Sequence, residues 1–192
     1  MQFRRVRGAD LAGVLALQED NLLENLSLEA RQGGFLSARF TREQFTRMDA
    51  DVAVLVAVDA GRVAGYLCAS SVEFNLQFPL LAAMIARFPD LSFAGRPLSE
   101  QTTCVYGPVC VDRGSRGRGV LRGMYRALLH ELAGRYDSGV AFVSNDNARS
   151  LAAHVEGLGM TGIGEFEFNA RPYRILAFAA GASSRDHAQS PD

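Results

Sequence analysis

The chain has no lysine and no tryptophan, so all 20 of its basic residues are arginines. The missing lysine excludes a Schiff-base mechanism, a lysine general base and the lysine-dependent phosphate loop of P-loop proteins. Basic and acidic residues nearly balance, with a formal net charge of −1, so no overall field attracts nucleic acid or an anionic membrane. We therefore expect neither nucleic acid nor a membrane as a partner.

Cysteine is also scarce, and its three copies, Cys68, Cys104 and Cys110, form no CxxC pair and no zinc-like spacing. The odd number, and the apolar run around Cys104 and Cys110, indicate buried reduced thiols rather than a disulfide framework. Polar residues at 18–20 interrupt the amino-terminal apolar stretch too early for a signal peptide, and no run reaches the ~18 apolar residues of a membrane span. We expect a cytoplasmic protein without a metal site.

The length of 192 residues and the hydrophobic content of 48% suit one globular domain with a substantial core. We expect this domain over residues 1–180, with an insertion at about 75–101. The small, polar and charged residues over 181–192 predict a disordered tail.

Hydrophobic periodicity predicts an alternation of strands and helices along the chain. The strands are predicted over residues 2–7, 52–58, 62–70, 102–111, 140–143, 165–168 and 173–178. The helices are predicted after Asp10 as a cap, from a Thr41…Gln44 capping box onward, and over 120–132 and 148–158. Hairpins and helical crossovers both occur in this order, so we expect a mixed sheet and the fold class α/β (α+β).

An arginine- and glycine-rich segment, residues 113–122, joins a strand ending near Val111 to a helix beginning near Val120. Glycines let backbone N–H groups converge on an anion, and the first turn of a helix adds unpaired N–H groups with partial positive charge. This pattern is typical of a pyrophosphate site. It is not the dinucleotide fingerprint GxGxxG, because Arg122 stands where the last glycine belongs. The alternatives are a solvated turn and an RGG-like RNA-binding segment, although no aromatic residues interleave with the arginines.

A second pattern follows the strand predicted at 140–143. Asn147 is placed to cap the next helix, and Ser150 and His154 follow it at helical spacing. The imidazole of His154 has an ordinary pKa near neutrality and can exchange protons at physiological pH. The alternative is a structural role for His154, packed on the apolar helix face that contains Val155.

Together the two patterns resemble those of the GNAT N-acetyltransferases. Arg116–Leu121 is similar to the R/Q-x-x-G-x-G/A loop that binds the pyrophosphate of acetyl-CoA in that family, with leucine at the final position. Asn147–Met160 resembles the family's N-x-x-S/A…Y/H…L-G-F stretch, and Val109–Val111 resembles its bulged fourth strand. The resemblance covers about residues 1–180. It implies a central mixed, mostly antiparallel twisted sheet of about seven strands, with helices on both faces and a splay between strands 4 and 5.

The resemblance also implies which residues form the site. His154 occupies the position of the family's tyrosine general acid. The segment 102–108 has no carboxylate where the family often places a glutamate, so Tyr106, Glu73 and Glu24 are open candidates for the general base. The implied cofactor-binding residues are Val109, Cys110, Val111, Arg116, Gly117, Arg118, Gly119, Val120, Leu121, Asn147 and Ser150.

The implied function is that of an acyl-CoA-dependent N-acyltransferase. Such an enzyme transfers an acetyl group from acetyl-CoA (CoA) to a primary amine of a small molecule or peptide by direct attack in a ternary complex. The apolar run 78–86 is expected to be a core helix, with a cover over the acceptor pocket or a homodimer contact as alternatives. The alternative function is a catalytically degenerate CoA-binding regulatory module.

Overall fold

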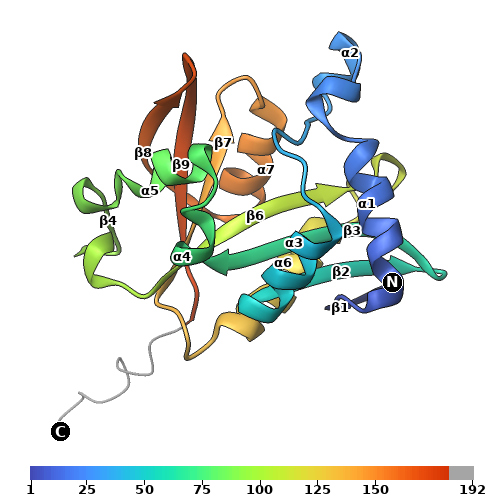
Figure 1. Cartoon of the computed structure of the whole chain (residues 1–192), viewed down its shortest axis with the longest axis horizontal. Helices are drawn as coiled ribbons and strands as arrows, with labels where there is room; N and C mark the ends of the chain where they lie inside the picture. The colour runs from blue at the N-terminus through green and yellow to red at the C-terminus, as the bar shows by residue number, and fades with distance from the viewer. Residues whose placement is uncertain (182–192) are drawn as a thin grey trace, which may run out of the picture.

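The protein is built on a seven-stranded sheet, seen in a computed structural model that describes residues 1–181 (Figure 1). The strands lie in the order β1-β2-β3-β6-β7-β9-β8, and every neighbouring pair is antiparallel except β6 and β7. Their bounds are β1 Gln2–Arg5, β2 Ala53–Asp59, β3 Arg62–Ser71, β6 Thr103–Val111, β7 Ser138–Ser144, β8 Thr161–Phe168 and β9 Arg171–Ala179, with a separate hairpin of β4 Ser92–Phe93 and β5 Arg96–Pro97. The predicted fold class is confirmed, whereas the tail predicted beyond Gly181 lies outside the described residues.

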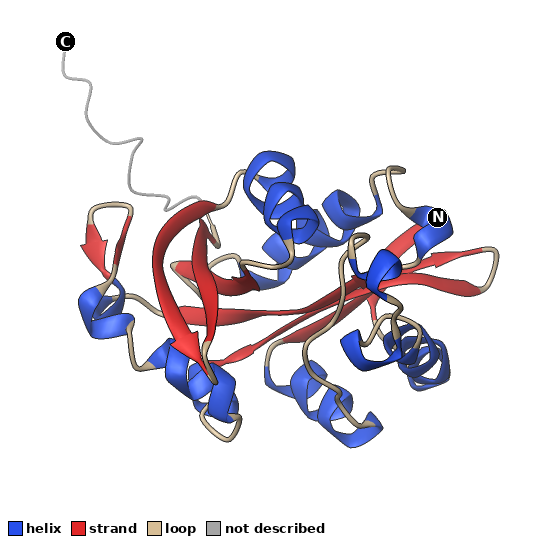
Figure 2. Ribbon diagram, turned by 90° about the horizontal axis from the view of Figure 1, so that it is seen from above, coloured by secondary structure: helices blue, strands red, loops and turns tan. Residues whose placement is uncertain are grey.

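Helices cover both faces of the sheet (Figure 2). Their bounds are α1 Leu11–Glu19, α2 Leu28–Arg31, α3 Arg42–Asp51, α4 Val72–Asn75, α5 Pro79–Ile85, α6 Val120–Leu132 and α7 Ala148–Leu158. Neighbouring residues of β2 point to opposite faces, since Val54 shares an apolar cluster with Phe45 of α3, whereas Leu55 shares one with Leu128 of α6. Because β2 is covered on both faces, its sequence is almost continuously apolar. None of the helices within residues 1–181 has the length and apolarity needed to span a bilayer.

The two predicted helix caps have different outcomes. The capping box of α3 is confirmed, because the Thr41 hydroxyl accepts from the Gln44 N–H and the Gln44 side chain accepts from the Thr41 N–H. The predicted Asp10 cap of α1 is wrong. Asp10 already has helical backbone angles at the end of a short 3₁₀ turn, and its carboxylate instead accepts from the Arg7 N–H and pairs with Arg4 at 2.7 Å.

The insertion predicted at about 75–101 forms α4, α5 and the β4–β5 hairpin between β3 and β6. Met84 of α5 is fully buried in an apolar cluster with Phe166 of β8 and Ile175 of β9. Figure 1 shows α5 beside these two strands. The apolar run 78–86 is therefore a core helix, as predicted.

Tyr66 of β3 offers a test of the core. Its ring is fully buried and packs edge-on against Phe45, with centroids 5.4 Å apart, but its hydroxyl has no hydrogen-bond partner within residues 1–181. Removing a buried hydroxyl that has no partner removes a desolvation cost, so we expect Tyr66→Phe to raise the free energy of unfolding by ~1 kcal/mol. Urea unfolding measures this difference. Tyr106→Phe is the matched control. The Tyr106 hydroxyl is hydrogen-bonded, so its loss should lower the free energy of unfolding. A lower free energy of unfolding in Tyr66→Phe would contradict the prediction.

Candidate functional site

Strands β6 and β7 separate partway along β6, and this splay, which the sequence predicted, forms the site. The two strands pair only through Thr103–Val105 and Ser138–Val140, whereas β7 pairs with β9 throughout its length. A register shift against β3 marks a bulge in β6 at Gly107–Pro108. Because proline has no N–H to donate, the sequence itself interrupts the ladder here. Beyond the bulge, residues 109–111 pair with β3 on one side and leave their other edge without a strand.

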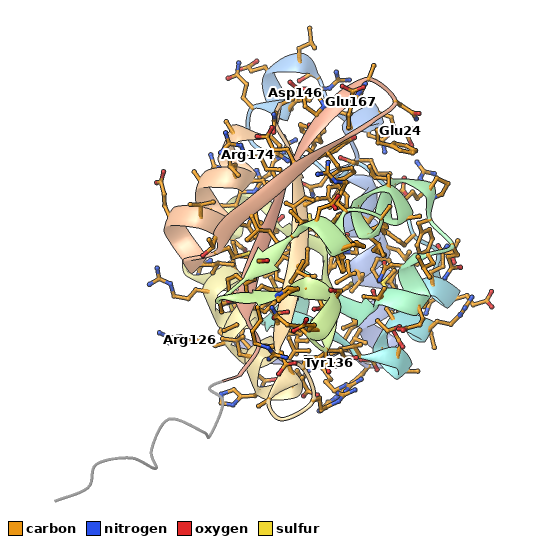
Figure 3. All side chains as sticks on the ribbon, turned by 90° about the vertical axis from the view of Figure 1, so that its left-hand side faces the viewer. Glu24, Arg126, Tyr136, Asp146, Glu167 and Arg174 are labelled. Carbon is orange, nitrogen blue, oxygen red and sulfur yellow. The ribbon has the colours of Figure 1, made fainter. Side chains whose placement is uncertain are left out.

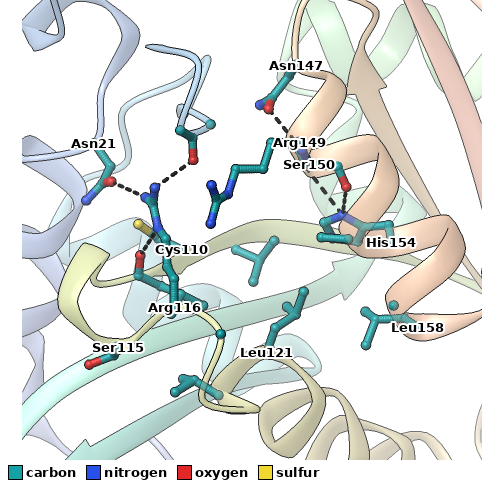
Figure 4. Close-up of a pocket in the computed structure, with 18 of the residues that line it drawn as sticks. Asn21, Cys110, Ser115, Arg116, Leu121, Asn147, Arg149, Ser150, His154 and Leu158 are labelled. Carbon is teal, nitrogen blue, oxygen red and sulfur yellow. Dashed lines mark hydrogen bonds between the residues drawn. The ribbon is translucent and has the colours of Figure 1, made fainter. Parts of the chain in front are cut away.

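A cavity of about 480 Å³ lies between this free edge of β6, the loop before α6, and α7 (Figure 4). Of the residues that the structure describes, three arginines and no acidic residue line it, so its field suits an anion. The lining includes His154 and all of the predicted cofactor-binding residues except one, namely Val109, Cys110, Val111, Arg116, Gly117, Gly119, Val120, Leu121, Asn147 and Ser150.

The loop before α6 presents backbone N–H groups to this cavity. Gly117 and Gly119 have φ angles of 75° and 78°, a left-handed conformation that glycine adopts without steric cost, and Gly119 is the N-cap of α6. Within the described chain, the N–H groups of residues 117–122 donate to no protein acceptor. Unpaired N–H groups at the start of a 13-residue helix, next to arginine side chains, are suited to bind a phosphate group.

Arg116 lines the cavity, but its guanidinium group is already occupied. It donates to the carbonyl oxygens of Val111, at 3.1 Å, and Gly33, at 2.6 Å, and to the side-chain oxygen of Asn21, at 2.9 Å. Burial is the main cause that lowers the pKa of Arg116, with Arg149 and Arg113 nearby adding to the shift. The side chain thus ties the phosphate loop to the segment before α3 and fixes the shape of the cavity wall.

Of the other arginines near the loop, Arg122 and Arg149 line the cavity, whereas the predicted cofactor-binding residue Arg118 does not. Arg118 does not line the cavity: its side chain is 60% exposed and lies 3.9 Å from Asp59. Arg122 lines the cavity and donates to the Gly157 carbonyl oxygen at 3.1 Å. Arg149, which sequence reasoning missed, points into the cavity from the first turn of α7 (Figure 4). The available signal was its position inside the N-x-x-S pattern.

Asn147 and Ser150 lie at the cavity wall on α7. The Asn147 side-chain oxygen accepts from the Ser150 N–H at 3.2 Å, which confirms the predicted cap. Its amide nitrogen donates to the Phe35 carbonyl oxygen at 3.2 Å. Asn147 therefore also holds the segment before α3 against α7.

His154 is buried, and both of its ring nitrogens have partners. Nδ1 lies 2.7 Å from the carbonyl oxygen of Ser150, so Nδ1 carries a proton and donates it. Nε2 lies 3.2 Å from the hydroxyl of Tyr106, which therefore donates to Nε2 of the neutral ring. Burial lowers the pKa of His154 below its ordinary value of 6.5, and the hydrogen bond to Ser150 opposes part of that shift. Burial also raises the pKa of Tyr106 well above 10.0, so at pH 7 the pair consists of a phenol donor and a neutral imidazole acceptor.

The orientation of α7 corrects one expectation. Val155 was assigned to the packed face together with His154, but Val155 is 38% exposed and His154 is the buried residue of α7. The helix turns its polar side, with Asn147 and Ser150, toward the splay. The apolar residues Leu151 and Leu158 of α7 still pack against the core, so of these three apolar residues only Val155 lies outside the packed face.

Cys110 lies on the free edge of β6, and its thiol is not a nucleophile at neutral pH. Burial raises its pKa to about 12. Cys104 is likewise free and buried, as predicted for Cys104 and Cys110, and Cys68 is free and buried as well. The contribution of Val109, Cys110 and Val111 to the cavity is therefore their backbone and apolar surface.

A second cavity, of about 170 Å³, adjoins the bulge in β6. It is lined by the segment 35–40 before α3, by the start of α5, by residues 106–109 and by residues 141–143 of β7. The two cavities share the lining residues Phe35, Leu36, Val109, Asn147, Ser150 and His154. They therefore meet at the splay.

The two carboxylates considered as general bases do not converge on this junction. Glu24 is exposed and accepts from Arg39 at 2.7 Å, and Glu73 lines a different hollow that also contains Tyr136. Figure 3 shows Glu24 and Tyr136 at opposite ends of the molecule. Of the three candidates, only Tyr106 lies at the second cavity and contacts His154.

Comparison with known families identifies the class of protein. The model of the GNAT acetyltransferase family matches residues 20–160. The chain therefore belongs to the GNAT acetyltransferase family. Comparison with curated protein sequences gives no match.

Solved structures share the fold at low sequence identity. A ribosomal-protein-alanine N-acetyltransferase from Brucella melitensis superposes with a TM-score of 0.60 and 20% identity over 93% of this chain and 99% of that chain. The protein yncA from Salmonella typhimurium, solved with its cofactor acetyl-CoA, superposes with a TM-score of 0.59 and 18% identity over 100% of this chain and 97% of that chain. NAA60 from Arabidopsis thaliana, in complex with a bisubstrate analogue, superposes with a TM-score of 0.63 and 13% identity over 93% of this chain and 97% of that chain.

Proposed function

We propose that this protein is an acyl-CoA-dependent N-acyltransferase that transfers an acetyl group from acetyl-CoA to a primary amine by direct attack in a ternary complex. The observation that carries the proposal is the meeting of two cavities at the splay, one bounded by an anion-binding loop and the other largely apolar. Two substrates can occupy them at once with their reacting groups beside His154. Solved structures named as ribosomal-protein-alanine N-acetyltransferases support an amine of a peptide as one acceptor class, and a small-molecule amine is the other.

The residues of the first cavity fit CoA. The unpaired N–H groups of residues 117–122 are placed to bind the pyrophosphate, and Arg149 supplies a side-chain cation beside them. The free edge of β6 at 109–111 can hydrogen-bond an extended amide chain as a neighbouring strand would. When bound, acetyl-CoA supplies the acetyl group as an activated thioester.

Tyr106 and His154 form the proton path that we assign to the reaction. The amine loses a proton as its C–N bond forms and the C–S bond breaks. That proton passes to the Tyr106 oxygen while the hydroxyl proton of Tyr106 passes to Nε2 of His154. Return of a proton along the same path to the departing sulfur restores both residues. The path uses the tautomer fixed by Ser150 and requires no carboxylate on β6.

Calorimetric titration with CoA and acetyl-CoA, followed by an assay of thiol release with a panel of amines, tests the proposal. We expect saturable binding of both ligands, and thiol release that depends on the amine and exceeds an amine-free control. Absence of binding at millimolar ligand would contradict the proposal. Binding without thiol release from any amine would support the catalytically degenerate CoA-binding module instead.

A further inference from the structure

We infer that the acceptor is a monoamine whose amino group is attached to an apolar group about the size of a benzene ring. This inference rests on the proposed function and concerns the second cavity. It is carried by three properties of that cavity: the chemistry of its lining, its size, and the charges around it.

The lining is mostly aromatic and aliphatic. Its apolar side chains come from four separated segments and include Phe40, Phe78, Leu80, Leu81, Pro108 and Phe142. Phe40 and Phe78 pack edge to face with centroids 5.5 Å apart, which fixes one wall. Binding an apolar group against this surface is favourable, because it removes apolar area of the substrate from water. A polar group would find few hydrogen-bond partners there.

The size of the cavity favours one kind of group inside it. Its volume is about 170 Å³. An apolar protein cavity of ~150 Å³ is known to accept benzene, so a phenyl or branched alkyl group matches the volume of this cavity. The polar groups at the junction, Tyr106 and His154, mark the end at which the amino group lies.

The charges disfavour a second ionised group on the acceptor. Among residues 1–181 no acidic residue lines the cavity, so a second ammonium group has no carboxylate partner there. In the described part of the chain, Arg39 is the one charged residue of the lining, and it is already paired with Glu19 at 3.1 Å and Glu24 at 2.7 Å. Polyamines and aminoglycosides are therefore poor fits, and a free carboxylate on the acceptor also lacks an available cation.

A matched series of amines tests the inference. With acetyl-CoA saturating, we expect kcat/KM for 2-phenylethylamine to exceed that for ethylamine at least ~30-fold, because the phenyl group becomes buried. Putrescine should react no better than ethylamine. A peptide amide with amino-terminal phenylalanine, run in parallel, distinguishes a free amine from a chain terminus carrying the same apolar group.

A variant of α5 sharpens the test. Leu81→Glu places a carboxylate in the lining, so we expect the preference between 2-phenylethylamine and putrescine to shift at least ~10-fold toward putrescine. Leu76→Glu is the matched control, since Leu76 is 54% exposed and does not line the cavity, and it should leave the preference unchanged.

The outcomes separate this inference from the proposed function. Failure of acetyl-CoA to bind contradicts the proposed function. Binding of acetyl-CoA with equal use of ethylamine and 2-phenylethylamine, or with preference for putrescine, overturns only the acceptor assignment. No turnover of this series, while another amine of the wider panel releases thiol, has the same meaning. Binding without thiol release from any amine contradicts the proposed function itself.

Discussion

Replacing Gly119 with glutamate is expected to weaken CoA binding at least ~100-fold, because like charges brought together at a binding site cost several kcal/mol. A Cβ added at Gly119 meets no atom within 4 Å, so the side chain has room, but its carboxylate lies beside N–H groups that would otherwise bind phosphate. Titration calorimetry measures the affinity, and circular dichroism reports whether the variant is folded.

Gly134→Glu is the control for backbone strain. Gly134 has a φ of 72°, close to the 78° of Gly119, and also has open space around its Cβ position, but it lies beyond the carboxyl end of α6 and outside the cavity. Both variants therefore incur the same conformational cost, and only Gly119→Glu should lose CoA. Equal affinity of the two variants would show that the loop does not bind the phosphate groups.

Removing the imidazole of His154 is expected to lower kcat about 100- to 10,000-fold, the range typical of loss of a general acid–base group. His154→Gln retains a hydrogen-bonding side chain, so the KM for acetyl-CoA should change little. Steady-state kinetics separate the two constants. His130→Gln, in the last turn of α6 and outside both cavities, should be indistinguishable from wild type. Wild-type kcat in His154→Gln would rule out the proposed proton path.

The pH dependence provides an independent check on Tyr106. Since burial lowers the pKa of His154, the neutral ring persists below pH 6.5, and kcat should fall only when the pH drops through that lowered pKa. The Tyr106 hydroxyl donates to Nε2 and so stabilises the neutral ring. In Tyr106→Phe both this donor and the relay to Nε2 are lost, so kcat should fall. The pKa of His154 rises, and the acidic limb of the pH profile of the remaining activity should move to higher pH. An acidic limb at the same pH in Tyr106→Phe and wild type would contradict the assignment of Tyr106.

The sequence predicted some elements to the residue because their signals are local. The helices α6 and α7 have their predicted bounds, since an apolar stripe and flanking glycine or asparagine mark both ends of each. The strands β8 and β9 extend beyond the predicted 165–168 and 173–178. Gly162 and Gly164 dilute the alternation at the start of β8, and burial against α5 and the hairpin partner compensates for their weak strand preference.

The sequence by itself determined the fold class and the family, because hydrophobic periodicity and short motifs, which are local properties of the chain, indicate both. Only the tertiary structure decided how the side chains are used. Arg116 reaches Gly33 across 83 residues, Asn147 reaches Phe35 across 112, and Tyr106 reaches His154 across 48. These contacts depend on where the splayed sheet brings distant segments together, and no local periodicity or spacing encodes that position. For the same reason the second cavity, which residues from five separated segments line, and the contact of Tyr106 with a neutral His154 emerged only in three dimensions.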